Sequence, residues 1–244
     1  MNKYYYDLHI HSCLSPCGDD DMTPNNIAGM CALNGINIAA VTDHNSAKNC
    51  PAFFEACKRY GIIPIAGVEL SSAEDIHFVC LFPELDMAMA FDRELEKHIP
   101  QISNRPEIFG EQMILNGEDE QIGVEEKLLI TATDLWADEA IGLARSFGAH
   151  VRPAHIDRTS NGIIAILGDV PREYNFNFVE FNDGANRKEY FDKYRSIADK
   201  SVIVSSDAHH LWDINTAQNY FEIDDEPYSS ANVRRKFFEM LCGN

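Results

Sequence analysis

The sequence predicts a single α/β domain that carries an insertion. Two observations point to this fold class. Segments typical of strands and helices alternate along the first 80 residues, and the alternation resumes after about residue 132. The segment 83–132 interrupts this pattern. With 244 residues, the chain is long enough for one large domain with a full hydrophobic core.

The first part of the chain is expected to form four strands and two helices. Thr23 followed by Pro24 is typical of a helix start, and Gly35 of the end of that helix. Pro51 and Gly61 delimit a second helix in the same way. The predicted strands are largely apolar runs at residues 4–10, 36–41, 62–70 and 76–82. Strands separated by helices favour a parallel sheet or a barrel.

Residues 83–132 are charged and are interrupted by prolines and glycines. They predict a mainly helical subdomain, which would be a cap inserted within a domain that spans residues 1–244. A helix that ends at Gly148 follows this segment. The remaining elements are expected to be strands at 150–154, 177–181 and 201–205 and a last helix from about Ser230.

The composition excludes several classes of protein. The chain has 20 Lys and Arg against 39 Asp and Glu, and its net charge of −19 argues against duplex DNA as a partner. No apolar run is long enough to span a membrane, and the first residues do not resemble a secretory signal. The seven cysteines are odd in number and lie mostly in apolar patterns. We therefore expect free thiols and a cytoplasmic protein without a membrane partner.

Histidines and acids gather at the ends of the predicted strands. His9 and His11 are two residues apart, so their side chains leave the same face of the first strand. Asp207 and His209 repeat this spacing after a late strand. The other candidates lie near the ends or starts of further strands and are His44, Glu69, His77 and His155. Because strand ends converge on one rim in a barrel, we predict a metal centre there.

The residue types indicate which ions this centre would bind. Imidazoles and carboxylates favour Zn²⁺, Mn²⁺ or Fe²⁺, with Mg²⁺ as a further candidate. The ligands are too many for one tetrahedral ion, so we expect two or three ions. Such clusters activate water to hydroxide and hold the attacking and leaving oxygens in phosphoryl transfer. Cys13 and Cys17 offer two thiols, which are too few for a closed structural zinc site.

Six short motifs run from residue 7 to residue 209. They read Asp7-Leu8-His9-Ile10-His11-Ser12, Thr42-Asp43-His44, Gly67-Val68-Glu69, His77, Ala154-His155 and Ser206-Asp207-Ala208-His209. In type and order they resemble the motifs of the polymerase and histidinol phosphatase (PHP) family. The resemblance implies a distorted (β/α)7 barrel with a trinuclear metal centre. The insertion between His77 and His155 is similar to that of stand-alone bacterial metal-dependent phosphoesterases.

The resemblance also implies three ligand sets. The first ion would be held by His9, His11, Glu69 and Asp207, the second by Glu69 as a bridge with His77 and His155, and the third by His44 and His209 with an acid of the first loop. That loop commonly reads Ser-Asp-Gly in the family, but here it is longer and carries three acids, of which Asp19 is favoured and Asp20 is the alternative. Asp43 either orients a ligand imidazole or caps the following helix.

These residues together predict a metal-dependent phosphoesterase, a hydrolase of EC 3.1 type. Its substrate would be a phosphomonoester or phosphodiester of a small nucleotide, a short single-stranded RNA or a sugar phosphate. Asp207, His209 and Arg158 are the candidate catalytic residues. Either a metal-bound water or His209 would protonate the leaving group. The planar guanidinium of Arg158 would bind the substrate phosphate, the alternative being a surface ion pair.

Two other functions fit the same residues. One is a non-catalytic metal-binding module with this fold, although such modules normally lose ligands and every expected ligand type is present here. The other is a metal-dependent hydrolase of C–N bonds, because related barrels with a His-x-His motif act on amides. Arg158 near the rim and the number of ligands favour a phosphate substrate.

Overall fold

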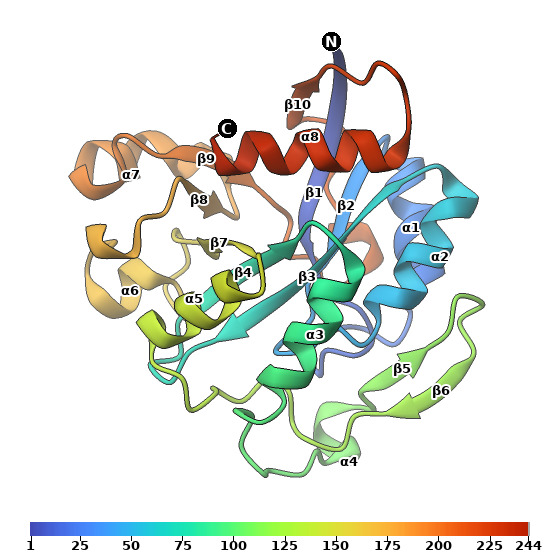
Figure 1. The fold of residues 1–244 in the computed structure, drawn as a ribbon. Coiled ribbons are helices and arrows are strands. Elements are labelled where there is room, and N and C mark those ends of the chain that lie inside the picture. Colours follow the sequence, from blue (N-terminus) through green and yellow to red (C-terminus); the bar gives the residue numbers. More distant parts are fainter. Residues whose placement is uncertain (244) are drawn as a thin grey trace.

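A curled six-stranded sheet occupies the centre of the molecule in our computed structural model, which describes residues 1–243 (Figure 1). In spatial order its strands are β10 (Tyr220–Ile223), β1 (Asn2–Ile10), β2 (Ile38–Val41), β3 (Ile63–Ser71), β4 (His77–Phe82) and β7 (His150–Pro153). A second, parallel pair consists of β8 (Phe178–Phe181) and β9 (Ser201–Val204). The fold is therefore mixed α/β, as predicted.

The strands of the central sheet do not all run in the same direction. β1, β2 and β3 are parallel, whereas β4 is antiparallel to both β3 and β7. Only five residues, 72–76, connect β3 to β4, which is too short for a parallel crossover. As a result, the start of β4 lies at the same edge as the end of β3, and His77 is paired with Ser71.

The structure contains a curled half-barrel sheet with helices around it. This agrees with the general shape of the expected barrel but does not confirm its (β/α)7 form. Within residues 1–243, the β8–β9 pair forms a sheet of its own rather than continuing the pairing of β7. A single bridge between Ile10 and Ala208 connects the end of β1 to the segment after β9. This bridge brings the two His-containing motifs at either end of the chain together.

Eight α-helices surround the sheets in the described part of the chain (Figure 1). They are α1 (Pro24–Leu33), α2 (Cys50–Tyr60), α3 (Leu85–Leu95), α4 (Pro106–Phe109), α5 (Ala137–Ser146), α6 (Ile163–Leu167), α7 (Arg187–Lys193) and α8 (Ser230–Cys242). Thr23 caps α1 by accepting a hydrogen bond from the backbone of Asn26, and Gly35 and Gly61 follow α1 and α2 with positive φ angles, as predicted. None of the helices within residues 1–243 is long and apolar enough to cross a membrane.

The segment 83–132 contains α3, the single-turn α4 and a hairpin of β5 (Met113–Leu115) and β6 (Gln121–Val124). The sequence patterns do not predict this hairpin, because its strands have only three and four residues and β6 is largely exposed. The short edge strand β10 is missed for the same reason. The hairpin is attached to the start of α2, where Asn49 Nδ2 donates to the Met113 carbonyl (3.0 Å) and Asn49 Oδ1 accepts from the Leu115 amide (2.9 Å).

Candidate metal centre

Six imidazoles and two carboxylates meet at the edge of the sheet where β1, β2 and β3 end. Each comes from a strand end or the loop beside it, and the eight residues are His9, His11, His44, Glu69, His77, His155, Asp207 and His209. Six of them line a cavity of about 330 Å³. These eight predicted residues are therefore neighbours in the fold, although they span 200 residues of sequence.

Glu69 lies at the centre of this cluster and is 1% exposed. Five imidazole nitrogens surround its carboxylate: Oε1 lies near His9 Nε2 (3.2 Å), His77 Nδ1 (3.0 Å) and His155 Nε2 (3.0 Å), and Oε2 near His11 Nε2 (3.2 Å) and His44 Nδ1 (3.2 Å). Burial opposes ionisation, but the surrounding imidazoles, first His77 and then His9, lower the pKa of Glu69 well below its usual range. Its two oxygens face different histidines, so the carboxylate is suited to bridge two ions.

Asp207 completes the cluster from the other end of the chain. Its Oδ1 lies 3.1 Å from His11 Nε2 and 3.3 Å from His9 Nε2, and its Oδ2 lies 2.7 Å from Arg158 Nη1. The backbone of Asp207 has a φ of 53°, and that of His155 a φ of 25°. Non-glycine residues adopt this left-handed region at a cost, and such strain is found most often at functional sites.

Seven of the eight residues, all except His155, fall together with Cys17 into three overlapping sets of potential ligands. In each set, one ligand atom per residue lies within 4.8 Å of the others; the sets are His9, His11, Glu69 and Asp207; His44, Glu69 and His77; and His11, Cys17, His44 and His209. Because the sets share His11, His44 and Glu69, they suit adjacent ions rather than separate sites.

An unpaired buried atom in the cluster fits this interpretation. His44 is 4% exposed, and its Nδ1 atom, which faces Glu69 Oε2 at 3.2 Å, makes no hydrogen bond with any residue that the structure describes. A buried polar atom without a partner is costly, and a metal ion would supply one. Burial alone would lower the pKa of His11, but contacts with Asp207 and Glu69 raise it to about 9, so this imidazole holds a proton that a cation would displace.

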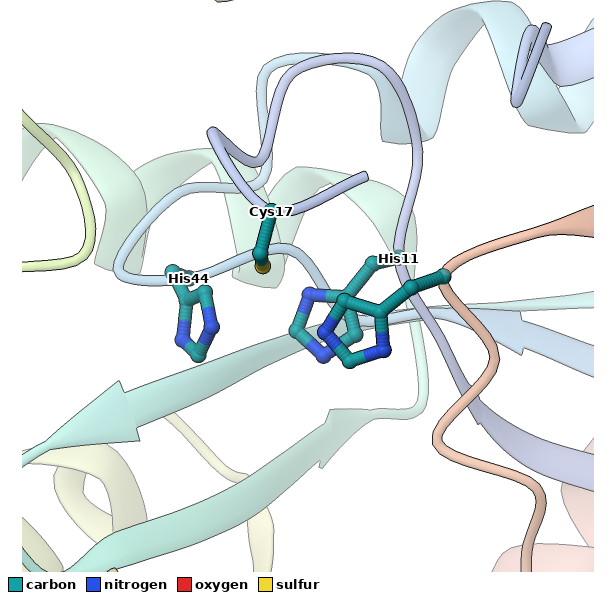
Figure 2. Close-up of side chains that lie close together, drawn as sticks. His11, Cys17 and His44 are labelled. Atoms are coloured by element: carbon teal, nitrogen blue, oxygen red, sulfur yellow. The ribbon is translucent and has the colours of Figure 1, made fainter. Parts of the chain in front are cut away.

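The first loop contributes Cys17 to the cluster instead of the expected acid. Figure 2 shows the Cys17 side chain pointing from the loop toward the space between His11 and His44. The side chain of Asp19 is 40% exposed and its Oδ2 lies 3.5 Å from His210 Nδ1, outside the three sets, and Asp20 is exposed. Burial raises the pKa of the Cys17 thiol.

A signal for Cys17 was present in the sequence. Cys17 precedes Gly18 as the acid precedes glycine in the Ser-Asp-Gly pattern, although a proline separates it from Ser15. The structure explains this glycine, because a Cβ atom at Gly18 would lie 2.4 Å from the Ser12 carbonyl oxygen. Three acids, Asp19 to Asp21, follow Gly18 directly and are equally plausible ligands by residue type.

Two further residues beside the cluster, Glu180 and Arg152, belong to none of the sequence motifs. Glu180 Oε1 lies 2.6 Å from His9 Nδ1, and Glu180 Oε2 accepts from Arg152 Nε (2.9 Å) and Nη2 (2.7 Å). Arg152 is fully buried, and it also donates from Nη2 to the Leu8 carbonyl (3.1 Å). Burial opposes ionisation of Glu180, yet Arg152 and His9 lower its pKa to about 2. The sequence signal for these two residues is that each places a charge between apolar neighbours within a strand, where charged side chains are rare unless they are paired.

Asp43 acts on the cluster through serines rather than by direct contact. Its carboxylate accepts hydrogen bonds from the Ser12 amide, the Ser12 hydroxyl and the Ser15 hydroxyl, each at 2.7 Å. Ser15 Oγ in turn lies 3.0 Å from His11 Nδ1. The alternative role, a helix cap, is not observed, because Asn49 occupies the N-cap position of α2.

Arg158 lines the cavity, and its side chain is 40% exposed. Asp75, Asn161 and Ile130 line the same cavity, and Ile130 belongs to the segment 83–132. Arg187 and Lys188, weaker candidates for phosphate contact, are exposed on α7, where Lys188 pairs with Asp192.

Comparison with known proteins gives a consistent picture. The model of the PHP domain family matches residues 7–216. The fold is similar to a lesion-specific endonuclease from Pyrococcus furiosus (TM-score 0.67, 18% identity, 99% of this chain and 56% of the endonuclease). It is also similar to a proposed metal-dependent phosphoesterase from Bifidobacterium adolescentis, with a TM-score of 0.59 and 16% identity over 96% of both chains. Another similar structure is an amidohydrolase from Chromobacterium violaceum, with a TM-score of 0.59 and 17% identity over 88% of this chain and 91% of the amidohydrolase. No curated protein sequence matches the chain.

The chain thus spans little more than half the length of the endonuclease. At identities below 20%, these structures establish a shared fold and leave the substrate to be inferred from the site itself.

Proposed function

Because the chain belongs to the PHP domain family, we propose that it is a metal-dependent phosphoesterase whose active site is the cluster around Glu69. The observation that carries the proposal is the location of Arg158. Its guanidinium contacts Asp207, and Arg158 lines the same cavity as the cluster. An anion that enters this cavity would meet both a cationic fork and the metal ligands.

We assign the ligands to three sites that share side chains. His9, His11, Glu69 and Asp207 would hold one ion, and Glu69, His77 and His155 a second. His44 and His209 would contribute to a third. Bound divalent ions, of zinc, manganese or iron, would activate water and neutralise charge that develops on the phosphate oxygens.

The remaining residues bind the substrate and hold the ligands in place. Arg158 would form two parallel hydrogen bonds to a phosphate, in competition with its contact to Asp207 Oδ2. Glu180 fixes the orientation of His9, so that His9 Nε2 faces Glu69 and Asp207. Burial lowers the pKa of His209 to about 4, so His209 is neutral near pH 7. This favours His209 as a ligand rather than as the acid that protonates the leaving group.

The cavity supports a small phosphorylated substrate, such as a nucleotide, a sugar phosphate or the end of a short single-stranded RNA. Its volume of about 330 Å³ is at the lower end of the range for small-molecule sites. Ile130 lines the cavity, which makes the segment 83–132 a candidate cap that limits substrate size. The net charge of −19 would repel an extended duplex, while divalent ions would make the cavity locally positive.

A substrate panel tests this function. Protein loaded in turn with Zn²⁺, Mn²⁺ and Fe²⁺ is incubated with phosphomonoesters, short single-stranded RNA, lesion-bearing duplex DNA and simple amides. We expect metal-dependent release from the first two classes, and a strong loss in folded Asp207→Asn protein. Cleavage of amides alone would favour the C–N bond hydrolase. One of the structures with a similar fold is an amidohydrolase. A folded, metal-bound protein that cleaves nothing would favour the non-catalytic module.

A further inference from the structure

We propose that the Cys17 thiolate is a metal ligand, which with His44 and His209 holds the third ion of the centre. The proposal rests on the proposed function only in placing this ion within the same cluster. It assigns to a sulfur atom the position for which the sequence predicts a carboxylate, and it changes which metals that position prefers.

Three separate segments bring the ligand atoms together. Cys17 lies in the loop after β1, His44 follows β2, and His209 follows β9. With His11, their potential ligand atoms lie within 4.8 Å of one another. All three side chains line the same cavity. Bonds of about 2.0–2.3 Å from one tetrahedral ion to nitrogen and sulfur place the ligand atoms about 3.3–3.8 Å apart, so the side chains would draw closer by up to about 1.5 Å on binding.

The buried imidazole of His44 is an independent indication of a ligand. His44 is 4% exposed, and its Nδ1 lies 3.2 Å from Glu69 Oε2 in a geometry that forms no hydrogen bond within the described chain. Its ring faces the same space as the Cys17 side chain in Figure 2. A buried imidazole nitrogen without a hydrogen-bond partner is available to bind a metal ion.

The backbone of the first loop fixes this arrangement and directs the acids away. The Gly18 amide donates to the Ser15 carbonyl (2.9 Å) and the Asp19 amide to the His209 carbonyl (2.9 Å). The latter bond ties the loop to the segment that carries His209. Asp19 Oδ1 instead accepts from the Asp21 amide (2.9 Å), so its side chain turns outward.

A thiolate would make this position chemically different from the other two. Soft sulfur ligands favour Zn²⁺ and Fe²⁺ over Mn²⁺ and Mg²⁺, which prefer oxygen. The other ligand sets contain only imidazole and carboxylate. We therefore infer a mixed centre, in which the ion beside Cys17 is zinc or iron whatever occupies the remaining positions.

Cobalt absorption tests the proposal without measuring activity. Full-length metal-free protein is titrated with Co²⁺, and the near-ultraviolet band of sulfur-to-cobalt charge transfer is followed. We expect the band in the wild type and its loss in Cys17→Ser and Cys17→Asp, with the latter still binding cobalt. Cys13→Ser is the matched control, because Cys13 is a buried cysteine of the same loop outside the ligand sets.

A band that is absent from the wild type, or that persists in both Cys17 variants, would overturn the proposal. Cys17→Asp restores the acid expected from the family pattern and so provides a folded variant should Cys17→Ser not fold. In mixed zinc and manganese, this variant should also bind less zinc and more manganese per chain than the wild type. The readouts are independent of turnover, so a band without phosphate release would count against the proposed function alone.

Discussion

Glu180 Oε1 lies 2.6 Å from His9 Nδ1, while the other oxygen of Glu180 binds the fully buried guanidinium of Arg152. The hydrogen bond leaves His9 Nε2 directed at Glu69 and Asp207. Carboxylates that bind the second nitrogen of a ligand histidine fix its orientation and raise its basicity. Glu180 therefore links a buried structural ion pair to the candidate metal centre.

Replacing this carboxylate is expected to affect both stability and metal binding. Glu180→Gln leaves the Arg152 charge buried without a partner, which costs about 3–5 kcal/mol of unfolding free energy. It also weakens metal binding about 10–100-fold, because His9 loses its charged partner. Denaturant unfolding of the metal-free protein and competition with a chelator measure the two effects.

A double variant separates the two effects. Glu180→Gln with Arg152→Gln removes both charges, so it should recover most of the lost stability while metal affinity stays low. If Glu180→Gln binds zinc as tightly as the wild type, Glu180 has no role in positioning His9.

Histidines of the cluster make the stability of the metal-free protein depend on pH. Burial opposes protonation of His9 and His11, but nearby carboxylates raise the pKa of His9 well above its usual value and that of His11 to about 9. Their contribution is fully present below an unfolded pKa of about 6.5 and is lost as the pH rises through 9. Burial lowers the pKa of His209 to about 4, so its contribution is lost as the pH falls from 6.5 toward 4.

Thermal unfolding of chelator-treated protein should therefore show the highest Tm near pH 6.5. Between pH 6.5 and 9 the Tm should fall, and added Zn²⁺ should reverse the fall because it binds the neutral imidazoles. A Tm that stays constant or rises over this interval in the metal-free protein would contradict the assigned directions.

Arg158 is expected to contribute to substrate binding rather than to metal binding. A hydrogen bond to a charged group contributes about 1.5–3 kcal/mol, so Arg158→Ala should lower kcat/KM about 10–100-fold, mainly through KM. Arg158→Lys should recover only part of the loss, because lysine lacks the planar fork. Metal content should not change.

Arg187→Ala is the matched control, since Arg187 is an exposed arginine on α7. Its kinetics should equal those of the wild type. An Arg158→Ala variant with unchanged KM and reduced metal content would instead assign Arg158 to the support of Asp207.

Gly18 is expected to be essential for the geometry of the first loop. A Cβ atom there would meet the backbone carbonyl oxygen of Ser12 at 2.4 Å, so the loop that carries Cys17 must move. Gly18→Ala should destabilise the protein by about 1–3 kcal/mol, the usual cost of overpacking, and should weaken binding of one ion per chain.

The control for this change is Gly142→Ala on the exposed face of α5, where a Cβ atom has no neighbour within 4 Å. That substitution should stabilise the protein by about 0.5–1 kcal/mol, because alanine favours the helix. A Gly18→Ala protein that keeps its Tm and its full metal content would show that the loop tolerates the side chain.

The sequence predicts most of the central fold because the relevant signals are local. Helix ends at Gly35 and Gly61 depend on single residues with positive φ, and buried strands such as β2 are short apolar runs. The reversed direction of β4 and the hairpin of β5 and β6 are not encoded in such periodicity. They depend on a five-residue connection and on contacts of Asn49 with residues more than 60 positions away.

The same distinction applies to the candidate metal centre. The sequence reveals His9 and His11, or Asp207 and His209, because two candidate ligands share one short motif. Glu180 and Arg152 each come singly from a strand, and their roles depend on which strands become neighbours. The position of the Cys17 side chain depends on the conformation of the first loop. Sequence spacing does not show whether Cys17 or one of the three acids after Gly18 points toward the cluster.

The central claim is that this cluster hydrolyses phosphate esters with bound divalent ions. Titration of metal-free protein with Zn²⁺, Mn²⁺ or Fe²⁺, combined with elemental analysis and an assay for phosphate release, tests it most directly. We predict that activity rises until two or three ions are bound per chain and disappears on chelation. Protein that binds these ions in full yet releases no phosphate, or that releases it equally well after chelation, would contradict the claim.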